Sequence, residues 1–522
     1  MKRTIISLVA CLATLLTVGA RDYTWHPERC KGQDSIDAAG AFVTHRLPRQ
    51  YLAIENCHLF NVAVNGADVA LYDDHNVWGG RLNFGSFEFE DGHEVEVTIT
   101  SREPITSYEL LPQSARSQVV DASPGGLTLR LTRADQKLTL IVNGDPRKGN
   151  VLHLFCNSID HSDPRPDLTS GYTYDERLKL HYFAPGYYDV DKMFDGKLTI
   201  TGDQSIYLAA GTVVRGCLGI EKGHGAHIYG RGMVFSDTQT RGGMMLTVNH
   251  SDSCTVEGLT FHRHAKDCWQ TGTGSSRRIT FSNLNIISGH YASTDGIDVC
   301  NSQDCTFDNC FVRASDDAIA IKGLERGSPA HCLPNRNLVF RRMQLWNDCN
   351  NAFGLGAETR AAVYENIRFE DSDILFSYDD PDFHEQLDER AAINICSLHG
   401  TWFKDIVCDN IRIYHCQRFV GLTFQPSFWF GAIPGDHSTP GGISRVTLRN
   451  IQCHPDSGSS IAGEVRMMGW YSPGTPTKLV EDIVFDQVYV DGRLLNSLDD
   501  ARFVTNNRHG IQLVKNPCEI VL

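Results

Sequence analysis

Three aspartates in two similar heptapeptides are the residues of this chain best suited to chemistry. The sequence STDGIDV occupies residues 293–299, and the similar sequence SDDAIAI occupies residues 315–321. Aligning them places Asp295 on Asp317 and adds Asp316 as a third carboxylate. Carboxylates held close together repel, which keeps one protonated beside an ionised neighbour. Cleavage of a glycosidic bond needs that combination, because an acid must protonate the leaving oxygen and a base must activate water. An inverting reaction would place acid and base about 6.5–9.5 Å apart, which a diagonal placement across the two heptapeptides could supply.

A six-residue repeat surrounds the heptapeptides and predicts how they are held. The repeat alternates apolar and polar residues, and its third residue is often Asn. The third residues are Gly258, Asn283, Asn309, Arg342, Asn366, Asn410, Asn450 and Gln487. A period in the twenties with alternating apolar residues is typical of a β-solenoid, whose coils stack about 4.8 Å apart. We therefore expect a right-handed parallel β-helix in which the heptapeptides lie on adjacent coils and the third residue serves a structural bend.

The earlier part of the chain predicts a different architecture. Residues 21–175 lack the repeat and carry alternating strands separated by turns, for example at 95–100 and 127–131. This pattern is typical of an antiparallel β-sandwich. The expected organisation is thus all-β, with a sandwich domain at 21–175 and a parallel β-helix domain at 176–522.

Residues 1–20 have the features of a secretory signal. Lys2 and Arg3 precede an apolar run that is too short to span a membrane, and Val18-Gly19-Ala20 offers a cleavage site. We expect a secreted or periplasmic protein with no membrane span. A lipoprotein anchor through Cys11 is the alternative, but the apolar run continues past that residue.

Charge and cysteine usage exclude several function classes. The formal net charge is -15, which argues against a nucleic-acid partner. Of the 17 cysteines, many occupy apolar strand positions and are interpreted as buried free thiols. No C-x-x-C pair of zinc-ribbon spacing occurs, and we expect neither a metal nor another cofactor. The expected partner is a polysaccharide or oligosaccharide substrate, and the sequence specifies no oligomeric state.

The motifs around the aspartates resemble those of the polygalacturonase family, glycoside hydrolase family 28. That family carries N-T-D followed by D-D, and here Thr294-Asp295 is followed by Asp316-Asp317 at similar spacing. The layout of a sandwich before a β-helix is similar to that of the dextranase and isopullulanase family, glycoside hydrolase family 49. Both resemblances imply a β-helix enzyme that inverts the anomeric centre. They imply that Asp316 is the general acid and that Asp295 and Asp317 hold and deprotonate water.

Two later motifs of the polygalacturonase family are replaced. Asn350-Asn351-Ala352 stands where the family has G-H-G, so Asn351 could substitute for the histidine as a hydrogen-bonding group. Residues 393–396, INIC, stand where the family has the basic R-I-K motif that grips a carboxylate. The loss of this basic pair favours a neutral sugar over galacturonan. Arg360 or Arg390 could supply a replacement cation, which keeps a uronic substrate open.

Further candidates for substrate contact flank the three aspartates. Lys322 follows the second heptapeptide and could touch substrate or pair with an aspartate. The other candidates are Glu358, Arg360, His290 and Tyr291, for each of which a surface-loop role is the alternative.

Two other function classes remain open for this chain. They are a polysaccharide lyase and a non-catalytic carbohydrate-binding β-helix. A lyase would need a basic or metal site to neutralise a uronate, and the carboxylate-rich motifs favour hydrolysis.

Overall fold

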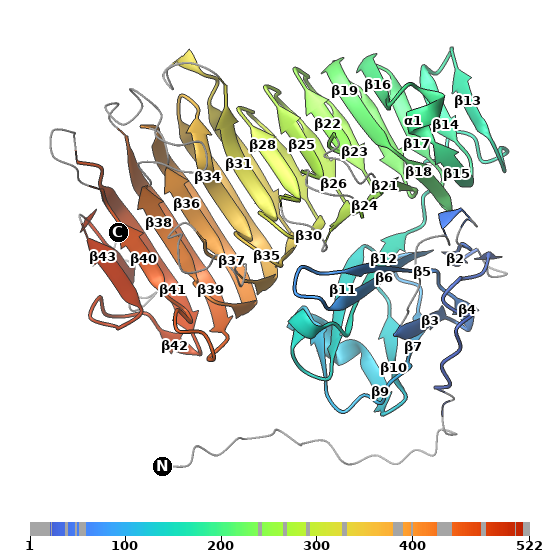
Figure 1. The fold of residues 1–522 in the computed structure, drawn as a ribbon, viewed down its shortest axis with the longest axis horizontal. Helices are drawn as coiled ribbons and strands as arrows, with labels where there is room; N and C mark the ends of the chain where they lie inside the picture. The colour runs from blue at the N-terminus through green and yellow to red at the C-terminus, as the bar shows by residue number, and fades with distance from the viewer. Residues whose placement is uncertain are drawn as a thin grey trace.

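The protein consists of an elongated stack of parallel strands with a smaller β-domain packed along its side (Figure 1). The computed structural model describes residues 21–514 except 22, 37–39, 47, 49, 52–58, 238–242, 265–268, 289–292, 326–330, 379–389, 398–399, 425–440, 471–476 and 507. The predicted signal at residues 1–20 lies outside the described residues.

Two sheets form the stack. The 11-stranded sheet contains β16 (Lys197–Gly202), β19 (Cys217–Gly223), β22 (Leu246–Asn249), β25 (Thr271–Gly274), β28 (Ile297–Cys300), β31 (Ile319–Leu324), β34 (Phe353–Arg360), β36 (Ile393–Ser397), β38 (Val420–Phe424), β40 (Val465–Met468) and β43 (Phe503–Asn506). The 22-stranded sheet contains β13 (Tyr172–Asp175), β14 (Leu180–Phe183), β15 (Gly186–Asp189), β17 (Ser205–Leu208), β18 (Thr212–Arg215), β20 (His227–Gly230), β21 (Met233–Ser236), β23 (Thr255–Glu257), β24 (Thr260–Arg263), β26 (Thr280–Ser282), β27 (Asn285–Ile287), β29 (Thr306–Asp308), β30 (Phe311–Ala314), β32 (Asn335–Arg341), β33 (Gln344–Asn347), β35 (Tyr364–Ser377), β37 (Trp402–Cys416), β39 (Gly442–Pro455), β41 (Val480–Val490), β42 (Arg493–Leu494), β44 (Arg508–His509) and β45 (Gln512–Val514). One short helix, α1 (Val190–Met193), lies between β15 and β16.

Alternating apolar residues hold the coils in register. Phe281 pairs with Phe307, and Phe307 pairs with Phe340 on the next coil. The rings of Phe307 and Phe340 stack with centroids 4.5 Å apart. These residues belong to one continuous buried core that runs the length of the stack from Phe183 to Leu495. Because strand side chains alternate in direction, every second residue of each strand enters this core.

Left-handed bends recur in successive coils and turn the chain. All eight predicted third residues have positive φ, from 52° at Asn309 to 77° at Gly258. Glycine and asparagine adopt this conformation most readily, which explains why they recur there. The side chain of Asn309 donates to that of Asn283 at 3.3 Å, so part of this column also forms a ladder. The structural role predicted for the third residue is confirmed.

One repeat is displaced from the predicted register. Phe369, rather than Tyr364, pairs with Phe340, and Tyr364 pairs with Asn335. Asn366 belongs to a second column of left-handed bends, where its side chain donates to Asn337 at 2.9 Å. The same apolar–polar pattern surrounds both bends of this coil, and the sequence-based alignment selected the wrong one.

The smaller domain is a sandwich of two sheets. The seven-stranded sheet contains β1 (Ser35–Ile36), β2 (Phe42–Thr44), β5 (Leu71–His75), β6 (Arg81–Phe89), β8 (Tyr108–Leu111), β11 (Gln136–Val142) and β12 (Val151–Ser158). The five-stranded sheet contains β3 (Phe60–Val64), β4 (Ala67–Asp68), β7 (Val95–Ser101), β9 (Val119–Ser123) and β10 (Gly126–Leu131). Two 3-10 helices accompany them, η2 (Gln113–Gln118) and η3 (Pro146–Lys148). The described strand pairs of this domain are antiparallel, apart from the parallel pair β6–β12. The predicted fold, a parallel β-helix preceded by a mainly antiparallel sandwich, is confirmed.

The seven-stranded sheet is buried on both faces. One face forms the sandwich core, with Leu140 and Leu154 among its residues. The other face packs Phe84 and Phe155 against aromatic residues of the β-helix, including Phe311 and Trp346. This double burial explains why the first seven residues of β12 are buried. The last sandwich strand ends at Ser158, and β13 begins the stacked sheet at Tyr172.

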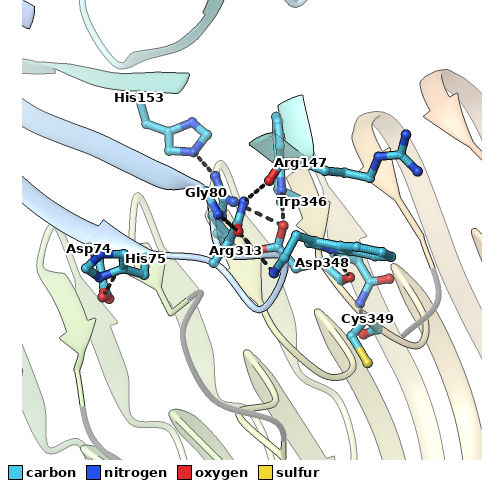
Figure 2. Close-up of polar contacts among 12 residues, drawn as sticks. Asp74, His75, Gly80, Arg147, His153, Arg313, Trp346, Asp348 and Cys349 are labelled. Carbon is cyan, nitrogen blue, oxygen red and sulfur yellow. Dashed lines mark hydrogen bonds and ion pairs between the residues drawn. The ribbon is translucent and has the colours of Figure 1, made fainter. Parts of the chain in front are cut away.

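A buried ion pair of the β-helix also contacts the sandwich. Arg313 donates two hydrogen bonds to Asp348, at 2.9 and 3.0 Å, and its third nitrogen lies 3.0 Å from Nε2 of His153 in the sandwich. Figure 2 shows Arg313 between these two partners, with Trp346 alongside. The indole of Trp78 in the sandwich donates to the carbonyl of Asp348 at 3.0 Å. The sandwich is therefore fixed both just before Asp316, at Arg313, and on the next coil, at Asp348.

The described cysteines are free thiols, most of them buried, as the sequence predicted. Within the described part of the chain, no helix is both long and apolar enough to cross a membrane.

Candidate active site

The two heptapeptides lie on adjacent coils, as predicted. Ile297 of β28 pairs with Ile319 of β31, and Asp298 pairs with Ala320. Continuing this register by two residues aligns Asp295 with Asp317, just before the two strands begin. The amide of Gly296 donates to the carbonyl of Asp317 at 2.8 Å, which locks the alignment.

The three aspartates form one cluster. One carboxylate oxygen from each of Asp295, Asp316 and Asp317 lies within 4.8 Å of the other two. Asp295 and Asp317 are buried, with 2% and 4% of their surface exposed, whereas Asp316 is partly exposed. These nearest oxygens are closer together than the 6.5–9.5 Å expected between an acid and a base, and the separation of the two acting carboxyl groups stays a prediction.

Two asparagines from the next coil orient the paired aspartates. The side chain of Asn350 donates to Oδ1 of Asp316 at 2.7 Å, and the amide of Asp317 donates to the same oxygen at 2.9 Å. The side chain of Asn351 donates to Oδ1 of Asp317 at 2.8 Å. Asn351 is itself fixed, because its carbonyl oxygen accepts from the amide of Ala391 at 2.9 Å. Asn351 thus contacts Asp317, and its predicted role toward substrate stays a prediction.

Lys322 is surrounded by carboxylates. Its ammonium lies 2.6 Å from Asp295, 3.4 Å from Asp298 and 3.9 Å from Glu358. The Lys322 side chain is only 5% exposed. The structure therefore shows Lys322 paired with an aspartate, and its contact with substrate stays a prediction.

Burial dominates the electrostatics of the cluster. It raises the pKa of Asp295 to about 7, against the opposing effect of the Lys322 ammonium. Burial, reinforced by the charges of Asp316 and Asp295, raises the pKa of Asp317 well above its usual range. Burial alone would lower the pKa of Lys322, but the surrounding carboxylates, Asp295 first, raise it. At neutral pH the cluster therefore retains at least one proton beside ionised groups.

Trp269 continues the column of site residues and was missed by the sequence analysis. The amide of Gln270 donates to the carbonyl of Asp295 at 2.8 Å, so Trp269 occupies on its coil the place that Asp295 occupies on the next. The Lys322 ammonium lies 4.0 Å from the centre of the Trp269 ring. Aligning residues 269–273 with 295–299 would have indicated this position.

A pocket opens beside Trp269 on the outer face of the 11-stranded sheet. It has a volume of about 320 Å³, and Trp269, Gly272, Gly274, Asp298, Asn301 and Glu325 are among its lining residues. A Cβ on Gly272 would approach the Asp298 carbonyl to 2.7 Å, so glycine is required by the close approach of the next coil. An aromatic wall above a floor of small residues leaves room for a ring that stacks on the face of Trp269.

The remaining predicted residues are placed differently. Glu358 joins the cluster through Lys322. Arg360 ends β34, where its carbonyl accepts from the side chain of Asn301 at 2.9 Å. His290 and Tyr291 lie outside the described residues.

Comparison with known proteins agrees with this architecture. The sequence model for Glycosyl hydrolases family 28 matches residues 174–355, a segment that contains all three aspartates. No curated protein matches the chain by sequence. Among solved structures, Dex49A from Penicillium minioluteum superposes with a TM-score of 0.60 at 13% identity, covering 92% of this chain and 99% of that one. The family 28 exopolygalacturonase of Yersinia enterocolitica gives a TM-score of 0.37 at 10% identity, covering 81% and 97%.

These matches define a class of protein. The central part of the chain resembles glycosyl hydrolases family 28 in sequence, and that match supports a glycoside hydrolase. The chain as a whole, sandwich included, has the fold of Dex49A.

Proposed function

We propose that the protein is a secreted inverting glycoside hydrolase that uses Asp295, Asp316 and Asp317 to cleave a polysaccharide or oligosaccharide. The observation that carries the proposal is the cluster of three carboxylates on adjacent coils, two buried and one partly exposed. The apolar start of the chain supports export, and N-terminal sequencing of the exported protein should find cleavage near Ala20.

Asp316 acts as the general acid. It is the most exposed of the three, so it can meet the leaving oxygen of a bound substrate. Its Oδ1 already accepts two hydrogen bonds, from Asn350 and from the amide of Asp317. Oδ2 is therefore the oxygen from which Asp316 would donate to the leaving group.

Asp295 and Asp317 hold and deprotonate the attacking water. The ion pair with Lys322 favours the ionised form of Asp295, which makes this residue the base. Its pKa of about 7 predicts that activity falls as the pH drops below that value, because the base becomes protonated.

A neutral sugar suits this site better than a uronate. The charge of Lys322 is already opposed by Asp295, Asp298 and Glu358, so it offers no net attraction to a further carboxylate. The pocket beside Trp269 adds Glu325, which would repel a uronate.

Substitution of the general acid tests the catalytic assignment. Asp316→Asn keeps the shape of the side chain and removes its acidity, so we expect kcat to fall about 10²–10⁴-fold while sugar binding persists. Asp304→Asn is the matched control, because Asp304 is exposed and also lies close to the first heptapeptide. Unchanged turnover in Asp316→Asn would sink the assignment.

Product analysis tests the substrate and the stereochemistry. Release of reducing ends is measured on dextran, other neutral glucans and polygalacturonate, and we expect hydrolysis of a neutral glycan. Proton NMR of the first product should show an inverted anomer. Retention would instead assign one of the clustered aspartates as a nucleophile, and unsaturated products would indicate a lyase.

A further inference from the structure

A second cluster of titratable groups lies where the sandwich meets the β-helix. Asp74, at the end of β5 in the sandwich, faces His262 of β24 and His264, which follows that strand. Oδ2 of Asp74 lies 3.0 Å from Nε2 of His262, and Oδ1 lies 2.9 Å from Nδ1 of His264. The three groups offer one donor atom each within 4.8 Å of one another. Figure 2 shows Asp74 on the sandwich segment that crosses the β-helix.

The cluster is enclosed in a way that orients its members. The side chains of Asp74 and His262 are completely buried, and that of His264 is 25% exposed. The hydroxyl of Tyr51 lies 2.6 Å from Nδ1 of His262, which fixes the ring and directs Nε2 toward Asp74. Phe84 and Phe235 pack against the His262 ring, with centroids 4.9 and 5.4 Å away. A ligating histidine commonly has such a partner on its second nitrogen, and an apolar shell around it.

The donor set has a recognisable chemistry. Two imidazole nitrogens and one carboxylate oxygen suit Zn²⁺ and related divalent transition metals, which bind such donors at about 2.0–2.2 Å. Donors around a tetrahedral ion at those bond lengths lie about 3.4 Å apart. The two observed nitrogen–oxygen separations, 2.9 Å to Oδ1 and 3.0 Å to Oδ2 of Asp74, are shorter than this, so the side chains would move apart to accept an ion.

We propose that Asp74, His262 and His264 bind a divalent transition metal of the Zn²⁺ class and that the ion clamps the sandwich to the β-helix. The sequence suggested no metal because Asp74 and His262 lie 188 positions apart in the chain. The partly exposed His264 provides the route by which an ion and a water ligand reach the site. The site lies outside the three-aspartate cluster, and its ligands come from both domains.

Titration with Co²⁺ tests the site in the full chain, after a chelator has removed any bound metal. We expect one Co²⁺ per chain, with visible bands typical of nitrogen and oxygen ligands and without the near-ultraviolet sulfur-to-cobalt band that thiol binding would produce. Zn²⁺ should compete with Co²⁺ and raise the melting temperature by several degrees. Tyr51→Phe should weaken metal affinity about 10–100-fold, because it removes the partner of the His262 ring.

The control variants separate this site from other histidines. His264→Ala should abolish stoichiometric uptake, and the change is tolerable because the side chain is partly exposed. His161→Ala is the matched control, since His161 pairs with the single carboxylate of Glu90 on the surface. Absence of uptake by the unmodified protein would overturn the proposal and leave a hydrogen-bonded Asp–His junction. Equal uptake by His264→Ala and the unmodified protein would overturn it as well.

Discussion

Lys322 sets the electrostatic balance of the aspartate cluster. Its buried ammonium lies among Asp295, Asp298 and Glu358 and over the ring of Trp269. The ammonium favours ionised carboxylates at positions where burial would otherwise keep them protonated. Its main effect in catalysis is thus expected on the protonation of Asp295 rather than on substrate affinity.

Removal of this charge should shift the pH profile. In Lys322→Met the carboxylate of Asp295 loses its counter-ion, so its pKa rises above the present value of about 7. The base is then protonated up to a higher pH, and the acidic limb of kcat/KM moves upward by about one pH unit or more. The measurement is the pH dependence of kcat/KM, with circular dichroism to verify folding.

Lys322→Arg is the companion variant, because it keeps the positive charge. Its acidic limb should stay close to that of the unmodified protein. A limb that moves equally in both variants would show that the geometry of the lysine, and not its charge, sets the pKa of the base.

The candidate site was predictable only where the sequence repeats itself. Asp295 and Asp317 occupy equivalent places on successive coils, so alignment of the two heptapeptides found them. Trp269 occupies the same column but shares no residue type with the aspartates, and the alignment therefore missed it. The pairing of Lys322 depends on which way a strand residue points and on burial, neither of which the motif specifies.

At the scale of elements, the bends determine the stack. The residues with positive φ stand between short strands, as Asn283 does, or inside the longer ones, as Asn450 does, and they fix where each coil turns. Alternating apolar residues predicted these strands, and the recurring asparagines predicted one column of bends. The sequence analysis did not separate the second column, which includes Asn337 and Asn366, from the first, because both columns have the same local pattern.

Substitutions at a bend should reveal the cost of its backbone conformation. Asn450 has a φ of 53°, which a β-branched residue tolerates poorly, so Asn450→Val is expected to lower the free energy of unfolding by about 1–2 kcal/mol. Asn450→Gly should be tolerated, because glycine adopts this conformation readily. Denaturant unfolding compares the two variants.

Gln452→Val controls for the introduction of an apolar side chain. Gln452 is exposed, lies two residues further along the same strand and is absent from the residues with positive φ. Gln452→Val should have nearly the same free energy of unfolding as the unmodified protein. If Asn450→Val is equally stable, the bend column does not contribute in the way proposed here.

At the scale of the molecule, the sandwich contacts many coils. Its described hydrogen bonds and ion pairs reach from Arg231, which donates to Ser158, to His415, whose Nε2 lies 2.9 Å from Glu109. Composition and motif spacing predicted both domains, but nothing in either predicted how they dock. Docking depends on side chains such as Phe84 and Phe311, which are far apart in the chain and meet only when both domains have folded.

The contact of His415 should make stability depend on pH. Burial lowers the pKa of His415, but hydrogen bonds to Asp456 and Glu109 outweigh it and raise the pKa to about 9. The stabilisation is therefore fully present below the unfolded value of about 6.5 and is lost as the pH rises through about 9. Melting temperatures measured across this range should fall at the alkaline end.

His415→Ala should remove this part of the pH dependence and lower stability by about 1–3 kcal/mol. His161→Ala, at an exposed histidine with one carboxylate partner, should leave the profile unchanged. An unaltered alkaline decline in His415→Ala would assign the effect to another group.

The long docking of the sandwich also decides how the stack can come apart. Coils of a solenoid touch only their neighbours, so an isolated one can fray from either end. Here the sandwich holds together the coils between Arg231 and His415, while β41 lies beyond these coils at the far end of the stack (Figure 1). Proteases should therefore trim the chain coil by coil from its C-terminal end and stop at the coils that the sandwich holds together. The resistant fragment then keeps the aspartate cluster.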